Sequence, residues 1–439
     1  MTIAASASLA SAQERLLPIQ LGSVRFYPSV ILATAWESNV ERVNEDDPLV
    51  SPVPSLVRGV RPILRFDLPL HEKNFVGAAY RGDYRSYSAE ELKDIGGTSH
   101  FVDLVGHFEA PTRFRLDAEQ HFVDGISELL NTYPGGEFRY TTQPLKTRES
   151  KLGFALDIGP IQSIEVGGSQ SQTKFQQSAT SRFFSDFRQQ NYFLHYVFSE
   201  GPQSKIYFSA DVQKVEQTRT DLLLQPDDYR TRSVGVGFRR ANNRDVSSDF
   251  RMAYSATDFK EGGLGTPFRG VTLEANLNFL LSVSGQAQVK LRRGPMPSFF
   301  NVSAYLINET AELNYRYALG RSVGLQLFLG WQRNTFSEPV QVRVESPSEA
   351  LLDVNPVDGI IDAYYYLLPS EGETRRDYLA AAGLTVVWHM SRAIDLSAGY
   401  LMQRSQSNIE GLNPVSGDPY NIYQYNAEAF TVAAILGWQ

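Results

Sequence analysis

Apolar and polar residues alternate along much of the chain, and this alternation is its dominant pattern. Residues 271–279 read VTLEANLNF, so every odd-numbered residue is apolar, and residues 205–213 and 323–332 show the same period of two. Successive side chains of a β-strand point to opposite faces, whereas a helix would scatter the same residues around its axis. The pattern therefore predicts strands that each have one apolar face and one polar or small face.

Repeated along the sequence, the alternation predicts an all-β chain of about eighteen antiparallel strands. We expect these strands near residues 22–40, 55–69, 73–88, 99–110, 113–125, 147–158, 161–177, 186–198, 204–218, 229–240, 246–259, 267–280, 283–292, 306–318, 321–337, 373–388, 391–406 and 421–439.

The links between these strands alternate in length. Tight turns such as residues 159–160 and 242–243 alternate with long links such as residues 41–54, 126–146 and 338–372. Alternation by itself also fits a soluble sandwich or propeller, but a propeller would repeat in blades of four strands, and the sequence has no such repeat. The two link lengths are typical of barrels of the Gram-negative outer membrane. We therefore predict one transmembrane β-barrel with short periplasmic turns, long extracellular loops and both termini in the periplasm.

Aromatic residues support this prediction because they gather near the expected strand ends. Amphipathic rings favour the headgroup layer of a membrane and form two girdles around such barrels. The candidates for these girdles are Tyr80, Tyr84, Trp331, Trp388, Tyr400 and Trp438.

Composition narrows the function classes. Hydrophobic residues make up 42% of the 439 residues, yet no run approaches the ~20 apolar residues of a membrane-spanning helix. Cysteine is absent, which excludes disulfide scaffolds and thiolate metal sites and fits export through an oxidising periplasm. The net charge of −8 argues against a nucleic-acid partner. No zinc or phosphate-binding motif is present, and we expect no cofactor and no metal site.

The first residues differ from the rest of the chain. Residues 3–13 are small and apolar and end in Ala10-Ser11-Ala12, which resembles a signal-peptide cleavage site. We expect residues 1–12 to be the remnant of a signal peptide and residues 13–439 to form the barrel. A segment of small residues without that role is the alternative.

If the apolar residues face lipid, many charged residues line the lumen. Two interpretations stay open: the charges pair and keep the lumen hydrated, or they form a path whose weak contacts let a hydrophilic polymer move on. Arg81, Asp83, Arg85, Arg113 and Arg115 are expected to form the densest group. The full set of candidate lumen residues is Arg65, Asp67, Arg81, Asp83, Arg85, Arg113, Arg115, Asp117, Glu119, Lys205, Asp211, Arg251, Glu274, Lys290, Arg292 and Asp395.

Loops add candidate contacts of a different kind. Tyr364, Tyr365 and Tyr366 lie in the long link at 338–372, where aromatic rings could stack on sugars or merely pack the loop. The links at 126–146 and 338–372 are candidate plugs of a barrel that is wide enough to hold an aqueous channel.

Several short motifs resemble a known family. Trp36-Glu37-Ser38-Asn39, the run from Arg81 to Tyr87, the run from Arg375 to Tyr378, Arg404 with Ser407-Asn408, and Asn426 resemble motifs of the β-barrel porins found in exopolysaccharide gene clusters. Trp36-Glu37 replaces the more usual Tyr-Asp of that family. The resemblance implies an outer-membrane channel that exports a polysaccharide chain, beside a polysaccharide copolymerase and a periplasmic export protein.

Two other functions remain alternatives. A diffusion porin for small solutes would use the same barrel, and an outer-membrane hydrolase would need a nucleophile beside a base. His107 and His121 lie near carboxylates, but no hydrolase motif accompanies them. Among partners we expect outer-membrane lipid and lipopolysaccharide. Bridging through the acidic stretches Glu45-Asp46-Asp47 and Asp227-Asp228 is one possibility, and plain solvated loop charge is the other.

Overall fold

The structure is a computed structural model, and its described part covers most of the barrel wall. The described residues are 18–40, 44, 51–71, 73–95, 97–110, 113–127, 143–175, 186–199, 203–218, 228–243, 246–260, 266–298, 305–339, 367–368, 374–408, 410–412, 419–421 and 424–437. The signal-like residues 1–12, Tyr364, Tyr365, Tyr366, Glu45-Asp46-Asp47 and Asp227 lie outside them, as do residues 128–142 and 340–366 of the two candidate plugs.

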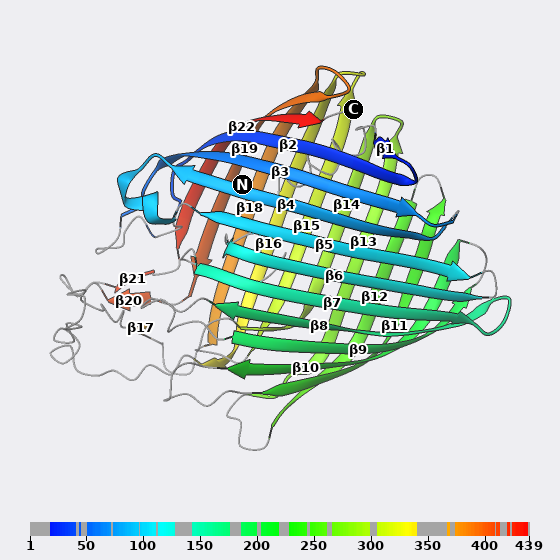
Figure 1. Cartoon of the computed structure of the whole chain (residues 1–439). Coiled ribbons are helices and arrows are strands. Elements are labelled where there is room, and N and C mark those ends of the chain that lie inside the picture. Colours follow the sequence, from blue (N-terminus) through cyan, green and yellow to red (C-terminus); the bar gives the residue numbers. More distant parts are fainter. Residues whose placement is uncertain are drawn as a thin grey trace.

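Eighteen antiparallel strands form one closed barrel (Figure 1). They are β2 (Val24–Glu37), β3 (Ser55–Pro69), β4 (Phe75–Tyr87), β5 (Thr98–Ala110), β6 (Phe114–Ser127), β7 (Gln143–Asp157), β8 (Gln162–Phe175), β9 (Asp186–Ser199), β10 (Ser204–Thr218), β11 (Tyr229–Asn243), β12 (Val246–Phe259), β13 (Arg269–Ser282), β14 (Gly285–Pro297), β15 (Tyr305–Leu319), β16 (Val323–Pro339), β18 (Thr374–His389), β19 (Ile394–Ser407) and β22 (Tyr425–Gly437).

The last strand closes the barrel against the first. Each strand pairs with its neighbour in chain order, and β22 pairs with β2 from Ser29 opposite Gly437 to Glu37 opposite Ala429. Closure leaves no open edge, which is the condition for a sheet to cross hydrocarbon because every backbone group then has a partner.

The two ends of the barrel differ in their links. At one end the links are five residues long or shorter, residues 70–74 being the longest. At the other end, links such as residues 38–54 are longer, and the 3-10 helix η1 (Glu90–Ile95) lies in one of them. A short strand, β1 (Ile19–Leu21), pairs with the start of β2 at the short-turn end, where β22 also ends.

A small separate sheet belongs to the loop side. Its strands are β17 (Leu367–Leu368), β20 (Glu410–Leu412) and β21 (Pro419–Tyr420). In Figure 1 it lies to the left of the barrel wall, whereas the short turn after β7 lies to the right.

All eighteen strands predicted from the alternation are present, and three of them, β3, β10 and β12, have identical bounds. The largest difference is in β14, which was expected to end at residue 292 and continues to Pro297. Beyond Arg293, β14 pairs with β15 but no longer with β13. Proline lacks the N–H that a second neighbour would need, so Pro295 is tolerated on this locally open edge.

Arg113 was expected on a strand, and this expectation is wrong. The residue lies in the turn between β5 and β6, is exposed, and has a φ of 79°. Its carbonyl accepts a hydrogen bond from the backbone N–H of Asp157. A three-residue turn reverses the chain through a left-handed residue, a requirement that alternation does not reveal.

The outer face of the barrel is apolar over most of its height. The side chains exposed there include Trp36, Leu194, Phe208, Val234, Tyr254, Trp331, Leu384, Trp388 and Phe430. In water such a continuous belt would drive aggregation, whereas in a bilayer it matches the hydrocarbon. Among the described residues, no helix is long and apolar enough to cross a membrane.

The inner face is not uniform around the barrel. Where β22, β2 and β3 meet it has an apolar patch: Ile31, Ile63 and Ile435 form a buried cluster against Ala433, and Ala33 and Ala35 continue it. On the same face, β3 also carries Arg61, Arg65 and Asp67. Most of the charged residues on the concave face belong to the strands from β4 to β15. The chemistry of the lumen is therefore concentrated on one part of the wall.

Candidate functional site

The charged cluster with the most members lies in the lumen close to the short-turn end. We call it the mouth network, and it consists of Arg115, Asp117, Glu165, His195, Tyr207, Ser209, Asp211, Arg239, Asp249 and Arg251. They come from β6 and from β8 through β12. Most lie within four residues of a short-turn strand end. They share one face of the sheet, because every second residue of a strand points to the same side.

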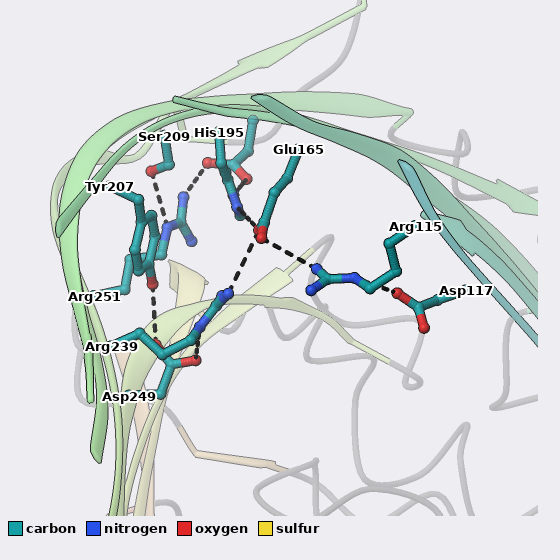
Figure 2. A network of polar contacts seen from close by, with 10 residues as sticks. Arg115, Asp117, Glu165, His195, Tyr207, Ser209, Arg239, Asp249 and Arg251 are labelled. Atoms are coloured by element: carbon teal, nitrogen blue, oxygen red, sulfur yellow. Dashed lines mark hydrogen bonds and ion pairs between the residues drawn. The ribbon is translucent and has the colours of Figure 1, made fainter. Parts of the chain in front are cut away.

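Glu165 is the centre of the mouth network (Figure 2). Its carboxylate oxygens lie 3.2 Å from Arg115 Nη2, 3.5 Å from Arg239 Nη1 and 3.7 Å from His195 Nδ1. The Glu165 residue is buried, so two guanidinium donors and the nearby imidazole replace much of the water that a carboxylate would otherwise bind. One carboxylate thus serves two guanidinium groups and an imidazole.

The order of the strands shows on which face of the sheet these side chains lie. Strand β7 separates Arg115 from Glu165, and strands β9 and β10 separate Glu165 from Arg239. Side chains from strands that are not neighbours meet only across the concave side of a sheet. Figure 2 shows the side chains within that curve, so the network lies in the lumen.

Besides Asp117, which pairs with Arg115, two further carboxylates belong to the network. Asp249 accepts hydrogen bonds from Arg239 Nε and from the Tyr207 hydroxyl, both at 3.1 Å. Asp211 pairs with Arg251, whose Nε also donates to Ser209 Oγ at 3.1 Å. These contacts fix the arginine side chains, because a guanidinium held at two nitrogens loses most of its rotamer freedom.

Ion pairs recur at other heights of the lumen. Near the loop side, Asp83 lies 3.0 Å from Arg61 and 2.5 Å from Arg85; Arg61 and Asp83 are buried, and the Arg85 side chain is 10% exposed. At mid-height, Lys151 lies between Glu119 and Glu149 at 3.5 and 3.2 Å. Ion pairs thus occur at several heights of the charged wall.

Histidines of the lumen also pair with carboxylates. His107 Nδ1 lies 2.6 Å from Asp117, His389 Nδ1 lies 2.8 Å from Asp395, and His121 contacts Asp103. Among the described residues, no serine hydroxyl is hydrogen-bonded to these imidazoles, and no group of three or more His, Asp or Glu side chains is arranged to hold a metal ion.

Apart from Arg113, which lies in a turn, the candidate lumen residues fall into three groups. Those with a partner are Arg65 with Asp67, Asp83 with Arg85, Arg115 with Asp117, Glu119 with Lys151, Asp211 with Arg251, and Asp395 with His389. Arg81 lies over the ring of Phe101, 4.0 Å from its centroid. In the part of the chain that the structure describes, Lys205, Glu274, Lys290 and Arg292 have no hydrogen-bond or ion-pair partner.

The dense group expected from Arg81, Asp83, Arg85, Arg113 and Arg115 does not form. The register pairs Phe75 with His107 and His107 with Asp117, so Arg85 lies ten residues along β4 from the position opposite Asp117. At ~3.3 Å per residue this separation is roughly 33 Å. Strands β4 and β6 run in the same direction, and Arg85 lies near the loop-side end of β4 whereas Arg115 lies near the short-turn start of β6.

Several members of the mouth network were missing from the expected set, notably Glu165, His195, Arg239 and Asp249. Each stands on the polar face of its strand in the alternating pattern. Extending the alternation to every strand finds them, although it does not reveal which of them meet.

A polar hollow adjoins the mouth network on its loop side and lies against β9 to β14. Its volume is about 240 Å³, and it is lined by amides, hydroxyls and charged groups that include Asn191, Gln213, Ser233, Glu274 and Arg292. Asn191 and Ser233 are held by hydrogen bonds to Ser169 and Ser255, respectively. Gln213, Glu274 and Arg292 have no partner among the described residues and present their polar atoms to the lumen.

Neither a protein-family model nor a curated protein matches the chain. Among solved structures, OccK2 of Pseudomonas aeruginosa in complex with glucuronate is 9% identical, with a TM-score of 0.46 over 94% of this chain and 98% of that one. OccAB3 of Acinetobacter baumannii is 8% identical, with a TM-score of 0.45 over 94% and 99%. The siderophore receptor PirA of P. aeruginosa is 9% identical, with a TM-score of 0.42 over 96% and 81%.

The location of the protein follows from its own surface. A closed barrel pairs the backbone of every strand, and an exposed apolar belt surrounds the wall. Both properties fit a hydrocarbon environment. Antiparallel barrels with short turns on one side and long loops on the other are typical of the outer membrane. The protein is therefore an integral β-barrel of the outer membrane of a Gram-negative bacterium.

Proposed function

We propose that the protein is an outer-membrane channel through which small hydrophilic solutes diffuse. The observation that carries this proposal is the combination of eighteen strands with a polar, charged inner wall from β4 to β15. Barrels of sixteen to eighteen strands leave an aqueous channel unless a segment plugs them. A lumen lined by amides, hydroxyls and ion pairs stays hydrated, which is what a small polar solute needs.

The pairing of the lumen charges sets the expected selectivity. Because carboxylates such as Glu165, Asp83 and Asp211 each contact an arginine, positive and negative potentials alternate over short distances. At 0.15 M salt the Debye length is about 8 Å, so such alternating charges largely cancel for an ion in the middle of the lumen. We therefore propose a channel with weak preference between small anions and cations.

The export of an exopolysaccharide stays a prediction from the short motifs alone. The same holds for the expected polysaccharide chain, copolymerase and periplasmic export partners. The structural feature closest to that role is the charged wall, and it serves small solutes equally well. A hydrolase would need a nucleophile within reach of a base, and none of the His–carboxylate pairs in the described residues has one.

Planar-bilayer recording and liposome swelling test the channel directly. The purified, folded barrel should produce discrete conductance steps in potassium chloride and should let vesicles swell in a small neutral sugar but not in a long dextran. Heat-unfolded protein is the control. A folded barrel that gives neither conductance nor swelling would contradict the proposal.

A gene deletion separates diffusion from export. We expect slower uptake of small polar solutes by the deletion strain and unchanged surface polysaccharide. Loss of surface polysaccharide with normal solute uptake would instead establish the export role.

A further inference from the structure

Charged residues on the outward face are almost all at the loop side of the barrel. Within six residues of the short-turn strand ends, the described outward positions carry one charged side chain, Arg240. At the loop-side strand ends they carry thirteen lysines and arginines, which we call the basic collar, against six carboxylates. The basic collar consists of Arg58, Lys146, Arg148, Lys174, Arg188, Lys214, Arg230, Arg232, Arg269, Arg293, Arg333, Arg376 and Arg404.

One part of the collar has an excess of positive charge held in a fixed geometry. Glu309 on β15 lies between Arg293 on β14 and Arg333 on β16, and the register places the three directly opposite one another. Arg293 Nε lies 2.9 Å from one carboxylate oxygen, and Arg333 contacts the other. A single carboxylate therefore neutralises one of two guanidinium groups, and one positive charge is left over.

The exposed parts of this triad are its cations. The Arg293 and Arg333 side chains are 42% and 40% exposed, whereas that of Glu309 is 16% exposed. By contrast, Arg232 pairs with Asp258 at 3.2 Å elsewhere in the collar, one cation for one anion. The triad thus offers, on the outward face, guanidinium donors that are only partly neutralised and that a carboxylate holds in place.

Depth along the strands places the triad at the edge of the hydrocarbon. A tilted strand crosses the hydrocarbon with about 9–11 residues. Arg333 is the eleventh residue of the 17-residue β16 from the short-turn end, and Glu309 is the eleventh of β15. Trp331 is exposed on the same face two residues deeper, as expected of a ring in the interfacial layer.

We infer that Arg293 and Arg333 bind a phosphate group on the headgroup of an outer-leaflet lipid. Phosphate accepts parallel hydrogen bonds from a guanidinium fork, and the two arginines are already oriented by Glu309. A lipid phosphate lies at the same depth as the triad and supplies the missing negative charge, whereas an unpaired guanidinium at the hydrocarbon edge would be costly. The rest of the basic collar raises the local concentration of anionic lipid.

Binding of defined lipids to the purified full-length barrel tests this inference. The probe is bisphosphorylated lipid A, compared with the same lipid after removal of both phosphates, and retention is measured by native mass spectrometry. Wild-type protein should retain the phosphorylated lipid and should retain it less in high salt. The double variant Arg293→Gln/Arg333→Gln should lose on the order of tenfold or more of this retention.

The matched control removes the same charge from the lumen. Lys205→Gln/Lys290→Gln eliminates two cations that have no partner in the described residues, and it should retain lipid A like the wild type. Glu309→Gln should raise retention, because it leaves both guanidinium charges unneutralised. This opposite change keeps the test decisive if the double arginine variant does not fold.

Three results would overturn the inference. Equal retention of the phosphorylated and dephosphorylated lipids would show that acyl chains alone bind. Unchanged retention in the double arginine variant would place the site elsewhere. Displacement of lipid A by millimolar inorganic phosphate would indicate a general anion site instead of a lipid site.

Discussion

At the scale of single residues, the lumen is organised by carboxylates that each serve more than one cation. Glu165 serves Arg115, Arg239 and His195 in the mouth network. Removing one member of a desolvated ion pair is costly because the partner charge is left without compensation. The mouth network is therefore both a determinant of the local potential and a structural link between β6, β8 and β11.

Sequence alone could place the members of this network but not connect them. The alternating pattern assigns Arg115, Asp117, Asp211 and Arg251 to the polar faces of their strands. The contacts depend on the register and on the curvature of the wall, which bring β6, β8 and β11 together. A period of two encodes neither the register nor the curvature. For this reason the prediction of a dense group around Arg81 and Arg115 was wrong.

Two substitutions with opposite signs test the mouth network. Glu165→Gln removes a negative charge and should shift the reversal potential in a potassium chloride gradient toward anion preference, whereas Arg239→Gln should shift it toward cation preference. Both should lower stability, by roughly 1–3 kcal/mol for Glu165→Gln, because the partly buried partner side chains lose their counter-charge. Recordings on single channels and the temperature of the heat-modifiable gel shift measure the two effects. Reversal potentials that stay at the wild-type value in both variants would contradict the role.

At the scale of strands, a single property of the sequence was enough to find every element of the wall. A membrane barrel needs one face for lipid and one for water along each strand, so its alternation is uninterrupted. The ends were less predictable. Arg113 was misplaced because a tight turn continues the period by chance, and the end of β14 was missed because its prolines are tolerated on an open edge.

A pair of arginine substitutions on β9 tests the two faces. Leu194 is 50% exposed on the outer face, and Asn191 lines the polar hollow on the inner face. Leu194→Arg should destabilise the barrel by ~2–4 kcal/mol, the cost of an arginine near the bilayer midplane, whereas Asn191→Arg should cost much less. The yield of heat-modifiable barrel in the outer membrane measures the difference. Equal yields for the two variants would refute the assignment of faces.

At the scale of the whole molecule, closure between β2 and β22 determines whether the sheet can exist in a membrane. The pairing joins strands from opposite ends of the chain, so no local pattern predicts its register. What the sequence does indicate is an even strand number, which brings the ends of the first and last strands to the same side. The apolar inner wall at this seam, formed around Ile31, Ile63 and Ile435, packs the closure from within.

Cysteine cross-linking tests this closure because the chain has no cysteine of its own. Ala33 lies opposite Ala433 across the seam. Directly opposed residues lie about 4.5–5.5 Å apart at their Cα atoms, within the range that a disulfide can span. The variant Ala33→Cys/Ala433→Cys should therefore cross-link on oxidation. The variant Ala33→Cys/Ala429→Cys, shifted by four residues, should not, and cross-linking of the shifted variant alone would show a different register.

The basic collar has a further consequence for how the barrel reaches its place. The loop side must pass through the hydrocarbon once, during assembly from the periplasm, and it carries the collar with it. An arginine at the bilayer midplane costs ~2–4 kcal/mol, so moving many of them together through an undisturbed bilayer presents a large kinetic barrier. Once the loop side has emerged, the same barrier opposes its return. The collar therefore makes insertion slow without assistance or local thinning of the membrane, and it makes the inserted orientation effectively permanent.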